Sequence, residues 1–192
     1  KVEKFLGGFP KGMTGQGGPF IAASPNTGDA EEFETTLVDL NQQINHWEGL
    51  QRLLRSLPLT APSDHFYISS RFGKRIDPIR KKWGRHYGLD LAGIFKSPVL
   101  ATAPGIVVSV MRHPKFGRVV EIDHGQGIRT RYGHLHRILV RKKQKVGFRQ
   151  KIGLMGNTGR STGTHIHYEI KVNGKPYDPM KFMEAGKYVF KR

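Results

Sequence analysis

Residues 164–171 read THIHYEIK, and polar and apolar side chains alternate along this stretch. Such alternation predicts a β-strand that packs one face on a core, because successive side chains of a strand point to opposite sides. Ile166 and Tyr168 would face that core, while His165 and His167 would project together from the other face. Two neutral imidazoles side by side suit a metal site. Two surface histidines on an edge strand are the alternative interpretation.

Further strands are predicted on the N-terminal side of this stretch, where short apolar or alternating runs end at turn residues. Examples of such turn residues are Gly125-Gln126-Gly127 and, beyond the HxH stretch, Asn173-Gly174. No long helical period interrupts the runs, so a compact, mostly β fold with antiparallel sheets is expected. The predicted strands cover residues 66–70, 97–103, 105–112, 118–124, 128–135 and 164–171.

The N-terminal part of the chain has a different pattern. Residues 1–28 are rich in Gly and Pro and show no apolar period, which predicts a flexible linker. Residues 29–57 predict one helix that Asp29 can cap and that Pro58 ends. The remaining residues, 58–192, would form the β-rich domain.

Apolar residues recur along the predicted helix at steps of three and four, as on one face of an amphipathic helix. One interpretation is the end of a coiled-coil stalk, and the other is a single helix packed on a neighbouring domain. Either interpretation predicts a regulatory or self-association partner for residues 29–57. The apolar residues are Phe33, Leu37, Leu40, Ile44, Trp47, Leu50, Leu54 and Leu57.

The amino-acid composition limits the kinds of site and partner that this chain can have. The 192 residues include no Cys, which excludes disulfides, thiolate catalysis and Cys-based zinc sites, so any metal must rest on His, Asp or Glu. Residues 58–192 hold 27 basic and 8 acidic side chains, which favours an anionic partner such as nucleic acid or a cell envelope. No run of about 18 apolar residues is present, although a membrane anchor upstream of Lys1 is compatible with the sequence.

Two more histidine motifs precede the HxH stretch. In the first, His86 and Asp90 are four residues apart, a spacing that can bring both side chains to one face and supply a mixed nitrogen and oxygen ligand set. In the second, Tyr132-Gly133-His134-Leu135, the histidine is either a general base or an ordinary polar residue near a turn. Neither motif is informative alone.

Taken together and in this order, the motifs are specific. GRHYGLDLAG (84–93), YGHL (132–135) and GRSTGTHIHYE (159–169) resemble the LytM-type zinc metallopeptidases of peptidase family M23, the lysostaphin-like endopeptidases. Flanking phrases, SSRFGKRIDP (69–78) and ATAPGIVV (101–108), are also similar to that family. The resemblance covers roughly residues 66–181 and implies a compact antiparallel β core with an open groove.

The resemblance also implies residue roles. His86, Asp90 and His167 would be the ligands of Zn²⁺, which leaves a fourth position for water. His165 and His134 would be catalytic. One of them would orient or deprotonate the water and the other would stabilise the oxyanion, and the sequence does not say which. A His₂-carboxylate set can also hold non-haem iron, but the resemblance favours zinc.

The function that the resemblance implies is hydrolysis of peptide cross-links in bacterial peptidoglycan, as a D,D-endopeptidase, by attack of a zinc-bound water. The protein would then be periplasmic or exported to the cell wall. The alternative is a non-catalytic LytM-like activator of a cell-wall amidase, but such proteins typically lack zinc ligands that this sequence retains. Nucleic acid is not an expected partner, because no DNA- or RNA-binding motif is evident.

Two further histidines differ in what they suggest. At His136 the family often has a small polar residue, so this side chain would either face the groove and tune substrate choice or simply be exposed. His124, in VEIDHG, is predicted to be structural.

Overall fold

The computed structural model describes residues 29–76 and 81–189, with side chains from residue 32 onward. The predicted flexible linker, residues 1–28, lies outside the described residues. The chain divides into two units between Asn45 and His46, and each is described separately. The predicted limits of the linker and of the β-rich domain stay predictions.

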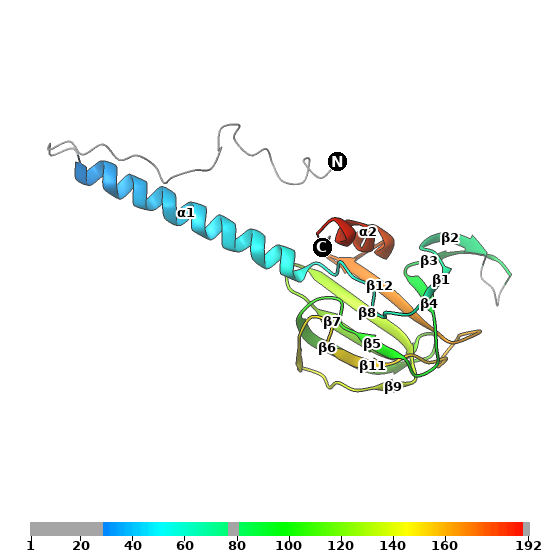
Figure 1. Ribbon diagram of the computed structural model, residues 1–192. Helices are drawn as coiled ribbons and strands as arrows, with labels where there is room; N and C mark the ends of the chain where they lie inside the picture. Colours follow the sequence, from blue (N-terminus) through cyan, green and yellow to red (C-terminus); the bar gives the residue numbers. More distant parts are fainter. Residues whose placement is uncertain (1–28, 77–80, 190–192) are drawn as a thin grey trace. The chain divides into compact units, whose positions relative to one another are not determined.

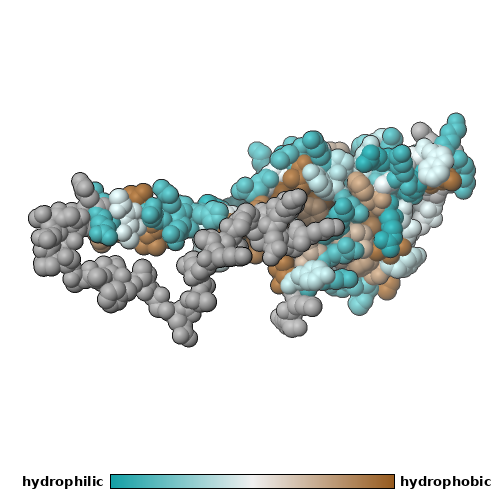
Figure 2. All heavy atoms as spheres, turned by 90° about the horizontal axis from the view of Figure 1, so that it is seen from above, coloured by the Kyte–Doolittle hydropathy of each residue, from teal (hydrophilic) through white to brown (hydrophobic). Residues whose placement is uncertain are grey.

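Helix α1 (Asp29–Ser56) confirms the predicted helix and ends one residue earlier than expected. Its last turn is closed by Ser56, whose hydroxyl donates to the carbonyl of Leu53, and Pro58 follows. In the first unit, apolar side chains of α1 such as Phe33 and Ile44 are exposed and lie among hydrophilic ones (Figure 2). The coiled-coil and packed-helix interpretations of this apolar face both stay predictions.

The second unit is built on one large antiparallel sheet, which Figure 1 shows with β12 beside β8. The strand of the HxH stretch, β12, pairs with β4 on one side and β8 on the other, so it is a central strand rather than an edge strand. In order across the sheet the strands are β1 (Tyr67–Ser70), β4 (Leu89–Ala92), β12 (His165–Val172), β8 (Ile128–Leu135), β7 (Gly117–Asp123), β6 (Gly105–His113) and β10 (Lys145–Val146), with β13 (Lys175–Tyr177) also paired to β12.

Two smaller sheets and one helix complete the unit. Helix α2 (Pro179–Val189) approaches the chain at Leu59 so closely that a Cβ on Gly186 would overlap the Leu59 carbonyl oxygen. In the described part of the chain, neither helix has the length and apolar character needed to cross a membrane. The smaller sheets are β5 (Pro98–Leu100), β11 (Lys151–Leu154) and β9 (Arg137–Ile138), and the ribbon of β2 (Gly73–Ile76) and β3 (Trp83–His86).

The core lies between the large sheet and the three-stranded sheet. Ile166, Tyr168 and Ile170 of β12 face it and are fully buried, as the alternation predicts. The hydroxyl of Tyr168 is within 2.9 Å of Thr102 Oγ1, and the Tyr132 hydroxyl is equally close to the same atom. The two buried phenols are therefore hydrogen-bonded rather than left without partners.

All six predicted strands are present. The largest difference concerns residues 97–103, of which only Pro98–Leu100 form a strand. Beyond it, the backbone of Ala101 still bonds that of Arg149 and Gln150, but the amide of Thr102 donates to the side-chain hydroxyl of Tyr132, so backbone pairing does not continue through Thr102. Helix α2 was missed, and so were seven strands of two to four residues, which are too short to show a clear alternation: β2, β3, β4, β9, β10, β11 and β13.

Candidate metal centre and groove

The strand register brings two of the predicted ligands together. Asp90 of β4 is the direct cross-strand neighbour of His167 of β12. On its other side His167 faces Gly133 of β8, which has no side chain to compete for the space. His165 faces Ala92, a small residue, in the same way. The polar face of β12 therefore opens above small neighbours on both sides.

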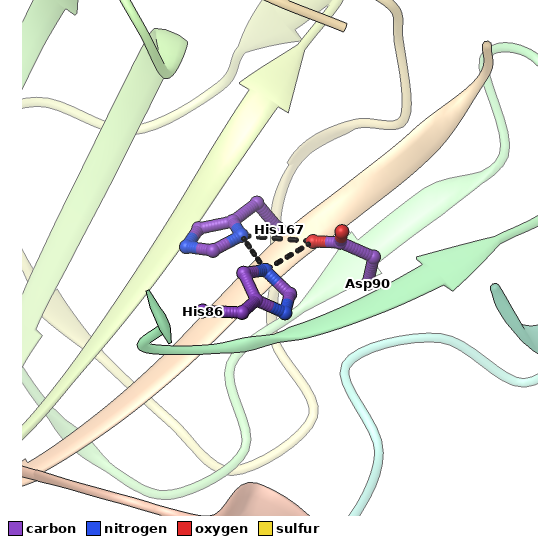
Figure 3. Close-up of side chains that lie close together, drawn as sticks. All are labelled: His86, Asp90 and His167. Carbon is purple, nitrogen blue, oxygen red and sulfur yellow. Dashed lines mark hydrogen bonds and ion pairs between the residues drawn. The ribbon is translucent and has the colours of Figure 1, made fainter. Parts of the chain in front are cut away.

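The third predicted ligand, His86, reaches the same point from the ribbon β2–β3 (Figure 3). His86 Nε2 lies 3.1 Å from Asp90 Oδ1 and 3.1 Å from His167 Nδ1, and His167 Nδ1 lies 2.8 Å from Asp90 Oδ1. Ligand atoms at the corners of a tetrahedral zinc site are about 3.3 Å apart, which follows from zinc–nitrogen bonds of about 2.0 Å. These three side chains, which we call the metal cluster, can hold a metal ion.

His86 and Asp90 were expected to share one face of an element because they are four residues apart, but they meet in a different way. The two residues do not share a helix or a strand, because a turn at Tyr87-Gly88 carries the chain from β3 to β4. A Cβ on Gly88 would lie 2.7 Å from His167 Cε1 and 2.7 Å from the Tyr168 carbonyl oxygen. The glycine therefore allows the His167 ring to approach the turn.

Each member of the metal cluster has a second partner outside it. His86 Nδ1 donates to the carbonyl of Arg71 at 2.8 Å, which leaves the Nε2 lone pair directed at the cluster. His167 Nε2 lies 3.0 Å from Glu169 Oε1, so Nδ1 is the nitrogen that faces the cluster. Arg75 of the ribbon lies 3.4 Å from the outer oxygen of Asp90. Such partners fix ring orientation and tautomer at metal sites, so this donor set fits a divalent ion.

The same contacts shift the pKa values of the buried groups in the site. Burial would raise the pKa of Asp90, but hydrogen bonds to His167 and His86 hold it well below its usual range, so the carboxylate is ionised. Burial acts to raise the pKa of Glu169 as well, but the contacts with His167, Arg131 and Lys171 lower it overall. Burial would lower the pKa of His167, and its bonds to the two carboxylates raise it instead.

The two predicted catalytic histidines form a pair beside the metal cluster. The ring centroids of His134 and His165 are 4.6 Å apart. His134 Nδ1 donates to the carbonyl of Thr158 at 2.6 Å, and His165 Nδ1 donates to the carbonyl of Gly163 at 2.8 Å. His165 Nε2 lies 3.9 Å from Asp90 Oδ1 and so points toward the cluster.

His134 has a rare backbone conformation and a lowered pKa. Its backbone has a φ of 59°, in the left-handed region that non-glycine residues rarely adopt, and its amide donates to the carbonyl of Phe116. Burial lowers the pKa of His134 to about 4, so the ring is neutral at neutral pH. A strained backbone and a neutral, oriented imidazole are features that cluster at functional sites.

A groove of about 640 Å³ runs over all five predicted residues. One wall comes from β1 and the ribbon, with Tyr67 and Tyr87, and the other from the turn at Phe116 and the loop 160–164. The ring of Phe116 stacks on that of His167 with centroids 5.0 Å apart. The metal cluster is therefore buried and yet lies at the base of an open groove.

Two other histidines lie outside this groove. His124 is buried, donates from Nδ1 to the carbonyl of Pro104 and bonds Thr130 through Nε2, which confirms its structural role. His136 is half-buried, does not line the groove, and packs edge-on against Phe95. His136 therefore neither faces the groove nor is simply exposed, so both interpretations of this residue are wrong.

Sequence reasoning missed the residues that hold the site in place. Glu169 and Arg75 contact metal-cluster side chains, and the carbonyls of Thr158 and Gly163 orient the histidine pair. Glu169 carried a usable signal, since it shares the strand face of His167 at a spacing of two. The carbonyl contacts depend on loop geometry and left no signal in the side chains.

Comparison with known proteins identifies relatives of this chain. The chain is 44% identical over 135 residues to peptidoglycan DD-endopeptidase ShyA of Vibrio cholerae, which covers 70% of this chain and 31% of ShyA. A crystal structure of a zinc containing peptidase from Vibrio cholerae superposes with a TM-score of 0.59 at 41% identity, over 62% of this chain and 38% of that one.

A more distant neighbour has the same fold. The catalytic domain of lysostaphin from Staphylococcus simulans superposes with a TM-score of 0.57 at 27% identity, over 63% of this chain and 99% of that domain. By contrast, the chain spans only about a third of the length of the curated relatives it matches.

The family comparison covers the site itself. The model of peptidase family M23 matches residues 84–179, which is half of the sequence. The matched segment contains the metal cluster and both histidines of the pair. The resemblance seen in the motifs is thereby confirmed, and this chain belongs to peptidase family M23.

Proposed function

We propose that this protein is a zinc-dependent endopeptidase that hydrolyses D,D-peptide cross-links of bacterial peptidoglycan. The observation that carries the proposal is the meeting of three metal-ligand atoms, 2.8–3.1 Å apart, with a histidine pair in one open groove. The names of the relatives support the substrate, since ShyA is a peptidoglycan DD-endopeptidase. Such an enzyme acts outside the cytoplasmic membrane, where its substrate lies.

Zinc is the metal we propose for the cluster formed by His86, Asp90 and His167. Two imidazoles and one carboxylate, with a fourth position open, are the usual donors of catalytic zinc. When bound, zinc supplies a Lewis acid that polarises the scissile carbonyl and activates a water molecule. Elemental analysis of the native protein tests the choice, and iron in place of zinc would contradict it.

We assign the proton acceptor role to His134. Its Nδ1–H is committed to the Thr158 carbonyl, and the low pKa keeps the ring neutral, so Nε2 can take a proton from the attacking water. His165 would stabilise the oxyanion. Its Nδ1 is bonded to the Gly163 carbonyl, and its Nε2 lies on the side of the metal cluster, 3.9 Å from Asp90 Oδ1.

The charge of the groove fits an anionic peptide. Its lining includes four basic side chains and two carboxylates. The carboxylates of Asp90 and Glu169 are engaged within the site by histidine and arginine. Peptide stems with free carboxylates would therefore be drawn into the groove, with an affinity that falls as salt rises. The basic residues are Arg75, Arg85, Lys115 and Arg160.

The test is purified protein on isolated sacculi and on defined cross-linked muropeptides, with products identified by mass spectrometry. We expect muropeptide release that a chelator abolishes and zinc restores. Asp90→Asn should be inactive, whereas Asp123→Asn, which changes an ion-paired carboxylate on β7, three strands along the sheet from β4, should be active. Zinc binding without any cleavage, together with stimulation of a cell-wall amidase, would support the activator alternative instead.

A further inference from the structure

Glu169 is the nearest charged neighbour of the metal cluster that is not itself a ligand candidate. It follows His167 by two positions on β12, so both side chains project from the same face of the strand. Its exposed fraction is only 2%, and its Oε1 lies 3.0 Å from His167 Nε2. A buried carboxylate is costly unless it is paired, so this contact needs further support.

That support comes from the neighbouring strands. Glu121 of β7, Arg131 of β8 and Glu169 of β12 are direct cross-strand neighbours in one row. Arg131 Nη1 donates to Glu169 Oε2 at 3.0 Å, and the same guanidinium also bonds Glu121. Lys171 Nζ lies 3.5 Å from Glu169 Oε2. Each oxygen of Glu169 thus has its own partner, one toward the metal cluster and one toward the cations.

The row has a direct geometric effect on His167. An imidazole with one nitrogen bonded to a fixed carboxylate cannot rotate freely, and its other nitrogen must point the opposite way. Here that other nitrogen, Nδ1, faces Asp90 and His86. Phe116 stacks on the same ring and restrains its plane.

We infer that Glu169 is a positioning residue that holds His167 with Nδ1 directed at the metal, and that Arg131 in turn holds Glu169. The inference rests on the proposed metal site. The negative charge of Glu169 also makes His167 a stronger ligand, because a carboxylate on the far nitrogen raises the basicity of the imidazole. The alternative is that Glu169 serves only as a counter-ion for Arg131.

Three variants separate these two roles. Glu169→Gln keeps the volume and one acceptor but removes the charge, and Glu169→Ala removes both. Glu121→Gln is the matched control, because it removes one charge from the same row and leaves the contact between Arg131 and Glu169 intact. Zinc affinity is measured by competition with a chromophoric chelator in the absence of substrate. Thermal unfolding of the zinc-free proteins reports the structural contribution.

We expect zinc affinity to fall by about 10–100-fold in Glu169→Gln, and further in Glu169→Ala, with little change in Glu121→Gln. The visible absorption spectrum of the Co²⁺-loaded protein should change in the Glu169 variants and stay as in the wild type in the control. Should Glu169→Ala not fold, the isosteric Gln variant carries the test.

Equal zinc affinities and equal cobalt spectra for Glu169→Gln, Glu121→Gln and the wild type would overturn the inference. So would a loss of zinc-free stability in Glu169→Gln without any loss of affinity. Failure of the proposed function gives a different result, since the wild-type protein itself would then bind no zinc or cleave no muropeptide.

Discussion

The side chains on the two faces of strand β12 are held in place by different interactions. On one face Ile166, Tyr168 and Ile170 are fully buried in the core, and burial of apolar surface holds them there. On the other face His167 and Glu169 are almost as deeply buried, but each is held by hydrogen bonds and charge. One strand therefore contributes both to the packing of the core and to the metal cluster.

The cross-strand neighbours repeat this division. Tyr168 faces Tyr132 of β8 on the core side, with ring centroids 5.4 Å apart, while Glu169 faces Arg131 on the polar side. A core face tolerates changes of shape at a moderate cost in stability, whereas a polar face depends on individual atoms. Substitutions on the two faces should accordingly change different properties.

The largest effect is expected for His167→Ala on the polar face. Removal of a proposed ligand leaves one imidazole and one carboxylate, so zinc binding and hydrolysis should both fall below detection. His136→Ala, a half-buried histidine away from the groove, is the control and should bind zinc normally. Equilibrium dialysis and muropeptide assays measure the two properties. Normal zinc content in His167→Ala would remove this residue from the ligand set.

A smaller effect is expected for the histidine pair. His134→Ala and His165→Ala should each lower the rate by about 10²–10⁴-fold, because each loses one proton-transfer or oxyanion contact. Zinc should stay bound, since neither side chain belongs to the metal cluster. Rates at saturating substrate and metal content are measured on the same preparations. Full activity of His134→Ala with zinc in place would contradict its proposed role.

On the core face, Ile170→Ala should lower the free energy of unfolding by about 2–5 kcal/mol, the cost of a cavity in a packed core. The rate per folded molecule and the zinc affinity should not change, because the side chain points away from the groove. Urea unfolding of the zinc-free protein and activity at low temperature test this. A selective loss of zinc affinity would show that the two faces are not independent.

The smallest effect concerns pH. Burial lowers the pKa of His124, and it lowers that of His134 to about 4. Below the unfolded value of about 6.5 the unfolded chain binds protons that the folded chain does not, so stability should fall as pH drops toward 4. Denaturant unfolding of the zinc-free protein at several pH values should show this slope, and His134→Gln should reduce it. If stability fell with pH as steeply in His134→Gln as in the wild type, His134 would have to be protonated in the folded state over this pH range.

Alternation predicted the long strands and put two histidines on one face, whereas the ligand set and the catalytic roles were implied by the resemblance to peptidase family M23. Alternation over residues 164–171 is strong enough to assign each side chain to a face, and this pattern alone puts His165 and His167 on the same side of the strand. The β2–β3 ribbon was not predicted, because four-residue strands with exposed side chains show no core-facing pattern. Nor could Arg75 be placed, since its contact with Asp90 depends on where the ribbon lies.

The ribbon also has a thermodynamic consequence. His86 belongs to the two-stranded sheet, whereas Asp90 and His167 belong to the large one. An ion bound by all three would cross-link two sheets that share no strand pairing, so part of its binding free energy would go into anchoring the ribbon. Metal occupancy and the position of one wall of the groove would then be a single coupled equilibrium.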